Sequence, residues 1–328
     1  MVRPILTGQL PLAVLGLIPR LLSSPGVAPA SLLDPTPLAA TLQAWNDWPA
    51  LRRNVARGDP HTVAVVATEA RSGRTVVFGD SAVELPAHRS HVLDYVATDI
   101  GVEHVRASAA IPLLFPPVRV EHPATAAGWY VDGSARLNTP IKPALDLGVD
   151  RLAVIATAAV HTPPVTATPH DPGQPDLWDG ALTMLHGNLI DPLIEDVRML
   201  GNVNMFFADG APGAGAYRAT RGKAAYRQIP YLFVGPDRPG AIGELAAAVF
   251  RARYSGLKAL RSPDLAFLHQ LLGSGPAHSE LFSYLFFDPE FIDALIAMGA
   301  ADARRWLDTT PADQPWQTEP LNGFTAQR

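Results

Sequence analysis

Apolar and polar residues follow two repeating patterns along the chain, one typical of helices and one typical of strands. After Asp34, which can cap a helix, apolar side chains recur at helical spacing at Leu38, Leu42, Trp45 and Trp48. Residues 61–70 form a Val-rich run typical of a buried strand, and residues 74–78 form a second such run. The short turn between the two runs contains Gly73, so this region is predicted to be a hairpin.

The same criteria divide the rest of the chain. Helical spacing of apolar side chains extends over residues 91–111, 141–147, 179–207 and 242–307. Short apolar runs predict strands at residues 128–131, 151–157 and 231–234, and the Pro-rich residues 113–120 have to be extended. Surface loops are expected at residues 158–175, rich in Pro, Thr and His, and at residues 209–222, rich in Gly and Ala.

Strands that alternate with helices predict an α/β fold, a layered sheet flanked by helices. We expect residues 1–240 to form this α/β domain and residues 241–307 to form a helical C-terminal portion packed on it. Residues 308–328 are expected to form a polar tail.

The N-terminal apolar segment is interrupted repeatedly. Gly8, Pro11, Gly16 and Pro19 break the run, and Arg20 closes it. A membrane-spanning helix needs about 20 consecutive, mostly apolar residues, so this segment is not predicted to span a membrane. We interpret it as an irregular apolar segment that begins in the middle of a domain; a signal peptide is the alternative.

Composition narrows the class of protein. The 328 residues are 48% hydrophobic and 17% charged, with a net charge of −5, which is typical of a folded chain rather than a disordered one. A mildly acidic chain without basic runs argues against nucleic acid as a partner. The chain has no Cys, which excludes disulfides, thiolate nucleophiles and Fe–S ligation.

The most informative stretch lies in the middle of the chain and contains four short motifs in close succession. They are RASAAIP at residues 106–112, FPPV at residues 115–118, WYVDGS at residues 129–134 and NTP at residues 138–140. Upstream, residues 68–74 read TEARSGR, followed by the second strand of the predicted hairpin. In this order and spacing the chain resembles the patatin-like phospholipase family over roughly residues 31–157.

The resemblance implies a patatin-like layered sheet whose N-terminal strands are missing, and an acyl hydrolase that uses a Ser–Asp dyad without a catalytic His. The Asp of the family's DG motif corresponds to Asp132, as general base, and its Gly to Gly133. A carboxylate at the end of a buried strand can take a proton from a Ser hydroxyl, and desolvation raises its pKa. The dipeptide alone would indicate only a turn, because Asp-Gly is a common turn sequence.

The nucleophile of that dyad is not recognisable. The family places it in a Gly-x-Ser-x-Gly elbow after a strand, with a Gly-rich oxyanion loop, and neither pattern occurs here. Ser274 lies between two glycines but lacks the spacing. Ser108 is expected to be a packing residue at a helix end, and Ser134 is too close to Asp132 in sequence to come from a separate elbow.

Two functions from different classes follow. The first is a lipid acyl hydrolase (phospholipase or esterase) of which this chain is an N-terminally truncated form, inactive alone. The second is a non-catalytic lipid-binding or interaction remnant of the same fold. An in-frame Gly-rich loop and Gly-x-Ser-x-Gly upstream of Met1 would favour the first, and a stop codon directly upstream would favour the second.

The expected partner is a lipid acyl ester, with contact at a membrane surface and none with nucleic acid, in the cytoplasm or peripheral to a membrane. We expect no cofactor and no metal ion. His88 and His91 do not form a His-Glu-x-x-His pattern. His161, His170, Asp171 and Asp176 share the Pro-rich loop, for which a polar surface loop is the simpler interpretation.

Overall fold

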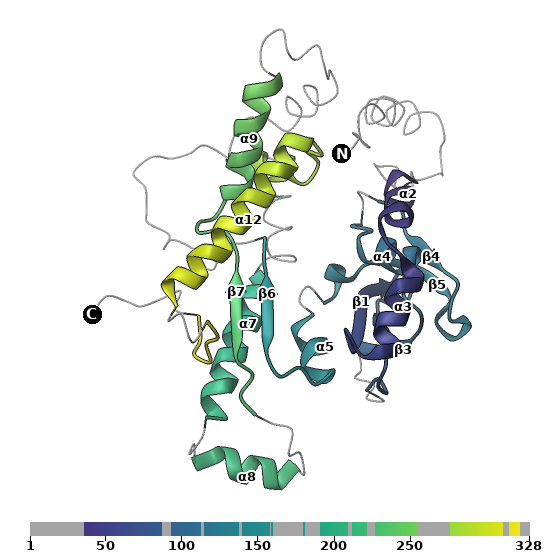
Figure 1. Ribbon diagram of the computed structural model, residues 1–328, viewed down its shortest axis with the longest axis vertical. Coiled ribbons are helices and arrows are strands. Elements are labelled where there is room, and N and C mark those ends of the chain that lie inside the picture. The colour runs from purple at the N-terminus through teal and green to yellow at the C-terminus, as the bar shows by residue number, and fades with distance from the viewer. Residues whose placement is uncertain are drawn as a thin grey trace. The chain divides into compact units, whose positions relative to one another are not determined.

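The protein is described by a computed structural model (Figure 1). It describes residues 36–86, 93–112, 115–137, 140–157, 159, 180, 191–208, 212–221, 227–254, 276–310 and 315–321. The chain divides into two compact units, Met1–Leu147 and Gly148–Arg328. The expected domain boundaries after residues 240 and 307 stay a prediction.

The first unit is built on a five-stranded sheet with the order β3-β2-β1-β5-β4. Its strands are β1 (Thr62–Glu69), β2 (Thr75–Ser81), β3 (Leu93–Ala97), β4 (Val118–Val120) and β5 (Gly128–Asp132). β1 pairs antiparallel with β2 and with β5, and β5 pairs antiparallel with β4. The predicted hairpin and the predicted strand at residues 128–131 are therefore confirmed.

The prediction of one continuous helix over residues 91–111 is wrong. Residues Leu93–Ala97 form β3, which pairs parallel with β2, and the helix α4 covers only Val102–Ser108. Leu93 and Val96 lie three residues apart and so imitate helical spacing, but the open edge of β2 selects the extended conformation. The helix then begins after Gly101, which is extended.

The α-helices described in this unit are α2 (Thr36–Trp45), α3 (Trp48–Arg57), α4 (Val102–Ser108) and α5 (Ile141–Asp146). Asp47 caps α3 by accepting a hydrogen bond from the Ala50 N–H, and α3 ends at Gly58 in the left-handed conformation. The core lies between α4 and the sheet, where Phe78, Tyr130 and Ala107 are almost completely buried. This core holds the end of β5 in place.

The second unit contains a two-stranded parallel sheet of β6 (Leu152–Ile155) and β7 (Tyr231–Val234). Its α-helices are α7 (Asp191–Phe206), α8 (Pro212–Arg221), α9 (Ala241–Tyr254), α11 (Pro276–Ser283) and α12 (Pro289–Thr309). In the described parts of this unit helices and strands occur where periodicity predicted them, except that residues 212–221, within the loop expected at residues 209–222, form the helix α8. Residues 212–221 are helical because Pro212 suits a first turn and the buried Ala214 packs inward.

The last three helices pack through aromatic rings. Phe250 of α9, Phe282 of α11 and Phe291 of α12 are at most 8% exposed. Asp288 caps α12 and also accepts a hydrogen bond from the Tyr254 hydroxyl, at 2.5 Å. The mixed α/β class with a helical C-terminal portion is thus confirmed, while the expected loop at residues 158–175 lies outside the described residues apart from Ala159.

Candidate active site

Asp132 is the last residue of β5, on the strand face that points into the core. It stands opposite Ala67 of β1, and its backbone N–H donates to the Ala110 carbonyl at 2.9 Å. Alternate residues of a strand point to the same side, so the Asp132 side chain shares its side with Tyr130, which is 2% exposed. The strand register therefore explains why this carboxylate is partly buried rather than solvated.

The turn after Asp132 packs directly against β1. A Cβ atom at Gly133 would lie 2.6 Å from the Val66 carbonyl oxygen, closer than real Cβ contacts. The buried Thr68 donates from its hydroxyl to the Gly133 carbonyl at 3.5 Å. Only glycine fits this position without displacing the backbone, so the turn geometry depends on the residue type.

The carboxylate is oriented by the turn that it begins. Residues Gly133–Ala135 form a short 3-10 helix, and the Ser134 N–H donates to Asp132 Oδ1 at 2.8 Å. The ordinary turn role of an Asp-Gly pair is therefore present here. It fixes the direction of the carboxylate and is compatible with a second, chemical role for the same group.

The pKa of Asp132 is raised above its ordinary value. Burial is the main cause, because it penalises the charged form, and hydrogen bonds from Ser134 oppose it in part. A carboxylate with a raised pKa is a stronger base than an exposed one and so better suited to accept a hydroxyl proton. The role of Asp132 as general base stays a prediction, and a raised pKa is a property that this role would use.

The three serines named in the sequence analysis differ in their position relative to Asp132. Ser134 contacts Asp132 through its own backbone N–H. Ser108 is half-buried at the end of α4 and, among the described residues, makes no hydrogen bond to Asp132. Ser274 lies outside the described residues. A nucleophile therefore remains a prediction without a located residue.

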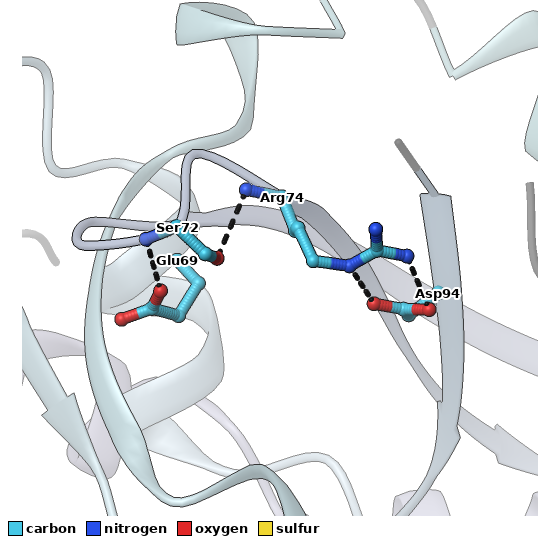
Figure 2. A network of polar contacts seen from close by, with 4 residues as sticks. All are labelled: Glu69, Ser72, Arg74 and Asp94. Carbon is cyan, nitrogen blue, oxygen red and sulfur yellow. Dashed lines mark hydrogen bonds and ion pairs between the residues drawn. The ribbon is translucent and has the colours of Figure 1, made fainter. Parts of the chain in front are cut away.

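The hairpin turn beside this site is braced by polar contacts (Figure 2). Glu69 accepts from the backbone N–H of Ser72 at 2.6 Å, and the Ser72 hydroxyl oxygen accepts from the Arg74 N–H at 3.2 Å. The Arg74 guanidinium then donates to both oxygens of Asp94 on β3, at 2.6 and 2.7 Å. These contacts connect the β1–β2 turn to the edge strand of the sheet.

These polar contacts and burial shift the pKa values of Glu69 and of the neighbouring Tyr130. Burial alone would raise the pKa of Glu69, but hydrogen bonds from Ser72 and Arg71 outweigh it and lower the pKa. Burial, together with the negative charges of Glu69 and Asp94, raises the pKa of Tyr130 to about 12. Its hydroxyl stays protonated and donates to the Ala126 carbonyl at 2.7 Å, so Tyr130 is a structural neighbour of Asp132 rather than a base.

Sequence reasoning missed two groups that position Asp132. Ala110 supplies the carbonyl for its N–H, and Thr68 supports the turn at Gly133. Both belong to motifs that had been noticed, RASAAIP and TEARSGR, but neither pattern shows which strand its residues meet. The signal for Ala110 was its small size within a run of alanines, which permits close packing against β5.

The described residues show neither a metal-binding group nor a membrane-spanning helix. In the part of the chain that the structure describes, no three His, Asp or Glu side chains form a group able to hold a metal ion. His88, His91 and the polar residues of the Pro-rich loop lie outside it. No helix within the described ranges has the length and apolar character needed to span a membrane.

Comparison with known proteins gives one match. Residues 21–145 match the family model described as patatin-like phospholipase. No curated protein matches the chain, and no solved structure matches it either. The matched residues include the whole five-stranded sheet, Asp132 and Gly133, and the resemblance stated from the sequence motifs is confirmed over this range.

Proposed function

We propose that this chain serves the hydrolysis of lipid acyl esters with Asp132 as general base, since residues 21–145 match the family model of the patatin-like phospholipases. The observation that carries the proposal is the placement of Asp132, partly buried at the end of β5 and oriented by the Ser134 N–H. The partner of Asp132 in this proposal is a serine hydroxyl.

The chemistry requires one carboxylate to act twice. In the first step Asp132 accepts the proton of a serine hydroxyl while the serine oxygen bonds to the acyl carbonyl carbon. The same proton then passes to the departing alcohol oxygen as the ester bond breaks. Water completes the cycle by hydrolysing the acyl-serine, with Asp132 again taking and returning a proton. A raised pKa supports both directions of transfer.

The sequence contains neither the Gly-rich oxyanion loop nor the nucleophile elbow that the family uses. The 328 residues contain no Gly-x-Ser-x-Gly, so the sequence does not identify the serine that Asp132 would serve. This absence favours a second candidate function, in which the chain binds lipid or a protein partner without catalysis.

Fluorophosphonate labelling and ester hydrolysis distinguish the two functions. A nucleophile within this chain would be modified at one serine, and Asp132→Asn would lower hydrolysis about 10²–10⁴-fold. Asp80→Asn is the matched control, because burial also raises the pKa of Asp80, at the end of β2 in the same unit. Equal losses in both variants would contradict the role of Asp132.

If the 328-residue chain is not labelled, a longer protein that includes the in-frame sequence upstream of Met1 has to be tested. If an in-frame Gly-x-Ser-x-Gly lies upstream of Met1, the longer chain should be labelled at that serine. Its hydrolysis should then fall in Asp132→Asn and not in Asp80→Asn. Absence of labelling and hydrolysis in both chains, with lipid binding retained, would support the non-catalytic function.

A further inference from the structure

The helix α12 has a buried side and an apolar side that is exposed. Phe291 and Asp302 lie on the buried side, where the helix packs against α9 and β7 (Figure 1). On the outer side Ile292, Ile296 and Leu307 are 41%, 66% and 54% exposed. A helix at a protein surface normally turns polar residues outward. The apolar outer side therefore indicates a contact surface.

The exposed apolar residues follow one line along the helix. Ile292, Ile296, Ala303 and Leu307 are separated by four or seven residues, which places them on the same side. Between Ile296 and Ala303 this line contains only small residues. We call the set the α12 stripe, and its members are Ile292, Ile296, Gly299, Ala300, Ala303 and Leu307. Large side chains thus lie at both ends of the stripe and small ones in the middle.

The packing of this chain does not require a glycine at position 299. A Cβ atom at Gly299 would meet nothing within 4 Å, and the residue is helical. Glycine lowers the stability of a helix interior. A position without a side chain does, however, allow the backbone of a second helix to approach closely. The middle of the α12 stripe therefore suits a helix as its partner.

Two exposed charges of opposite sign flank the stripe on one side. They are Asp293 and Arg304, and neither has an ion-pair partner within the described residues. They are eleven residues apart, about 16 Å along the helix, so they cannot pair with each other in one chain. Each of them is available to a group on a partner.

The other charged residues of α12 are paired or lie further from the stripe. Glu290 pairs with Arg253 of α9, and Arg305 pairs with the buried Asp302 at 2.9 Å. Asp308 is exposed near the end of the helix. Exposed carboxylates on α12 therefore outnumber its guanidinium groups, and this balance does not favour an anionic lipid surface as the partner.

The α12 stripe is complementary to a second copy of itself that runs in the opposite direction. With a two-fold axis midway between Gly299 and Ala300, Ile296 of one copy lies level with Ala303 of the other. Ile292 then lies level with Leu307. Large side chains meet small ones beside the axis and meet each other at the two ends of the contact.

The same arrangement pairs the free charges. Asp293 of one copy lies within about 3 Å, measured along the helices, of the level of Arg304 in the other. The two-fold axis makes this pair twice. In a parallel arrangement each charge would instead face its own copy and repel it. Charge complementarity thus selects the antiparallel direction.

We propose that the α12 stripe is the contact between two copies of this chain, packed antiparallel about a two-fold axis between Gly299 and Ala300. The contact consists of one helix from each copy, which is small for a protein interface, so the dimer should dissociate on dilution. The inference goes beyond the proposed function and does not depend on Asp132.

Sedimentation of the 328-residue protein over a concentration series measures the association. Ile296→Glu should raise the dissociation constant at least tenfold, because it places a charge in the apolar contact of each copy. Met199→Glu is the matched control, because Met199 is 62% exposed on α7 and the change of side chain is similar. A monomer at all concentrations up to about 1 mM, or equal weakening in both variants, would overturn the proposal.

The chain has no Cys, so a single introduced cysteine reports the direction of the two helices. Ala300 lies beside the proposed axis, and Ala300→Cys should form a disulfide between copies under oxidising conditions. Leu307→Cys is the control, because its two copies would lie about 22 Å apart along the helices. A disulfide in Leu307→Cys and none in Ala300→Cys would overturn the antiparallel contact.

Charge exchange tests the two ion pairs. Asp293→Arg and Arg304→Asp each place like charges opposite one another and should weaken the dimer severalfold. The double variant should restore association, because both pairs form again with their signs exchanged. Circular dichroism should show equal helix content in all variants. A double variant as weak as the single ones would overturn the proposed pairing.

Association and hydrolysis are measured separately. Asp132→Asn should form the dimer as the unmodified protein does, even if it has lost all hydrolysis. Hydrolysis by a protein that stays monomeric would retain the proposed function and overturn the dimer, and the reverse result would retain the dimer alone. A monomer that floats with lipid vesicles, and loses this binding in Ile296→Glu, would assign the α12 stripe to lipid and also overturn the proposal.

Discussion

At Gly133 the turn that follows Asp132 leaves no space for a side chain. A Cβ there would meet the Val66 backbone, which cannot move away without distorting β1. Gly133→Ala should therefore lower the free energy of unfolding by about 1–3 kcal/mol, as measured by urea denaturation. Gly128→Ala at the start of β5 is the control, because a Cβ at Gly128 meets nothing closer than 3.5 Å; equal effects would contradict the argument.

Asp132 itself should oppose folding at neutral pH. Its pKa is raised in the folded state, so the folded protein binds the proton more tightly than the unfolded chain does. Between pH 3.8 and the raised pKa, stability then falls as pH rises. Asp132→Asn should be at least as stable as the unmodified protein at pH 7, with the difference shrinking toward pH 3.8. Denaturation at several pH values measures this, and a less stable variant at pH 7 would count against it.

The buried His104 should make the folded protein less stable as the pH falls below 6.5. It is fully buried; Nδ1 accepts from the Gly101 N–H at 3.1 Å, so Nε2 carries the proton that it donates to the His122 carbonyl. Burial is the main cause that lowers its pKa below 6.5. The unfolded chain therefore binds a proton more readily, and stability should fall as pH drops below 6.5.

His104→Gln tests this directly. The variant should lose about 1–3 kcal/mol of stability at pH 7.5 through lost hydrogen bonds, and its stability should change less between pH 7.5 and 5.5. Unfolding in urea at the two pH values gives both quantities. The exposed His61, changed to Gln, is the control for the substitution itself and should leave the stability at pH 7.5 nearly unchanged; an equal loss of stability would contradict the argument from burial of His104.

At the scale of elements, the Arg74–Asp94 pair connects the hairpin to β3 through two short hydrogen bonds between half-buried side chains. A double-mutant cycle with alanine should give a larger coupling free energy for this pair than for Arg119–Glu121, which is more exposed. Thermal unfolding of the four proteins of each cycle provides the values. Equal coupling would mean that the pair adds nothing to the attachment of β3.

Local sequence patterns predicted the elements that pack against a neighbour close in the chain. β1 and β2 meet across one turn, so their alternation and Gly73 sufficed to predict the hairpin. β3 could not be recognised in this way, because pairing with β2 rather than its own spacing decides its conformation. Helix α8 was mistaken for a loop because glycines lower helix propensity while packing of Ala214 and Tyr217 restores it.

In the candidate site too, sequence patterns predicted contiguous residues but not contacts between distant segments. Asp132 and Gly133 were found because their motif is contiguous in sequence. Their supports, Thr68 and Ala110, come from other elements, 64 and 22 residues from Asp132. Spacing along the chain does not show which backbone carbonyl a strand end will meet, so this part of the site needed the fold.

At the scale of the whole molecule, the two compact units carry different features. The first contains the partly buried carboxylate and all of the residues that match the family model. The second contains α9, α11 and α12, which pack together through aromatic rings.

The last described residues belong to the body of the second unit. Gln317 exchanges two backbone hydrogen bonds with Tyr231 of β7, and the Tyr231 hydroxyl donates to the Glu319 carbonyl at 2.6 Å. During translation the first unit emerges before the second, and domains generally fold as units in that order. The second cannot complete β7 until residues 317–319 have emerged, more than eighty residues after the strand itself. A ribosome stalled in this interval would expose an unfinished sheet edge, so chaperones should be needed most during the synthesis of that stretch.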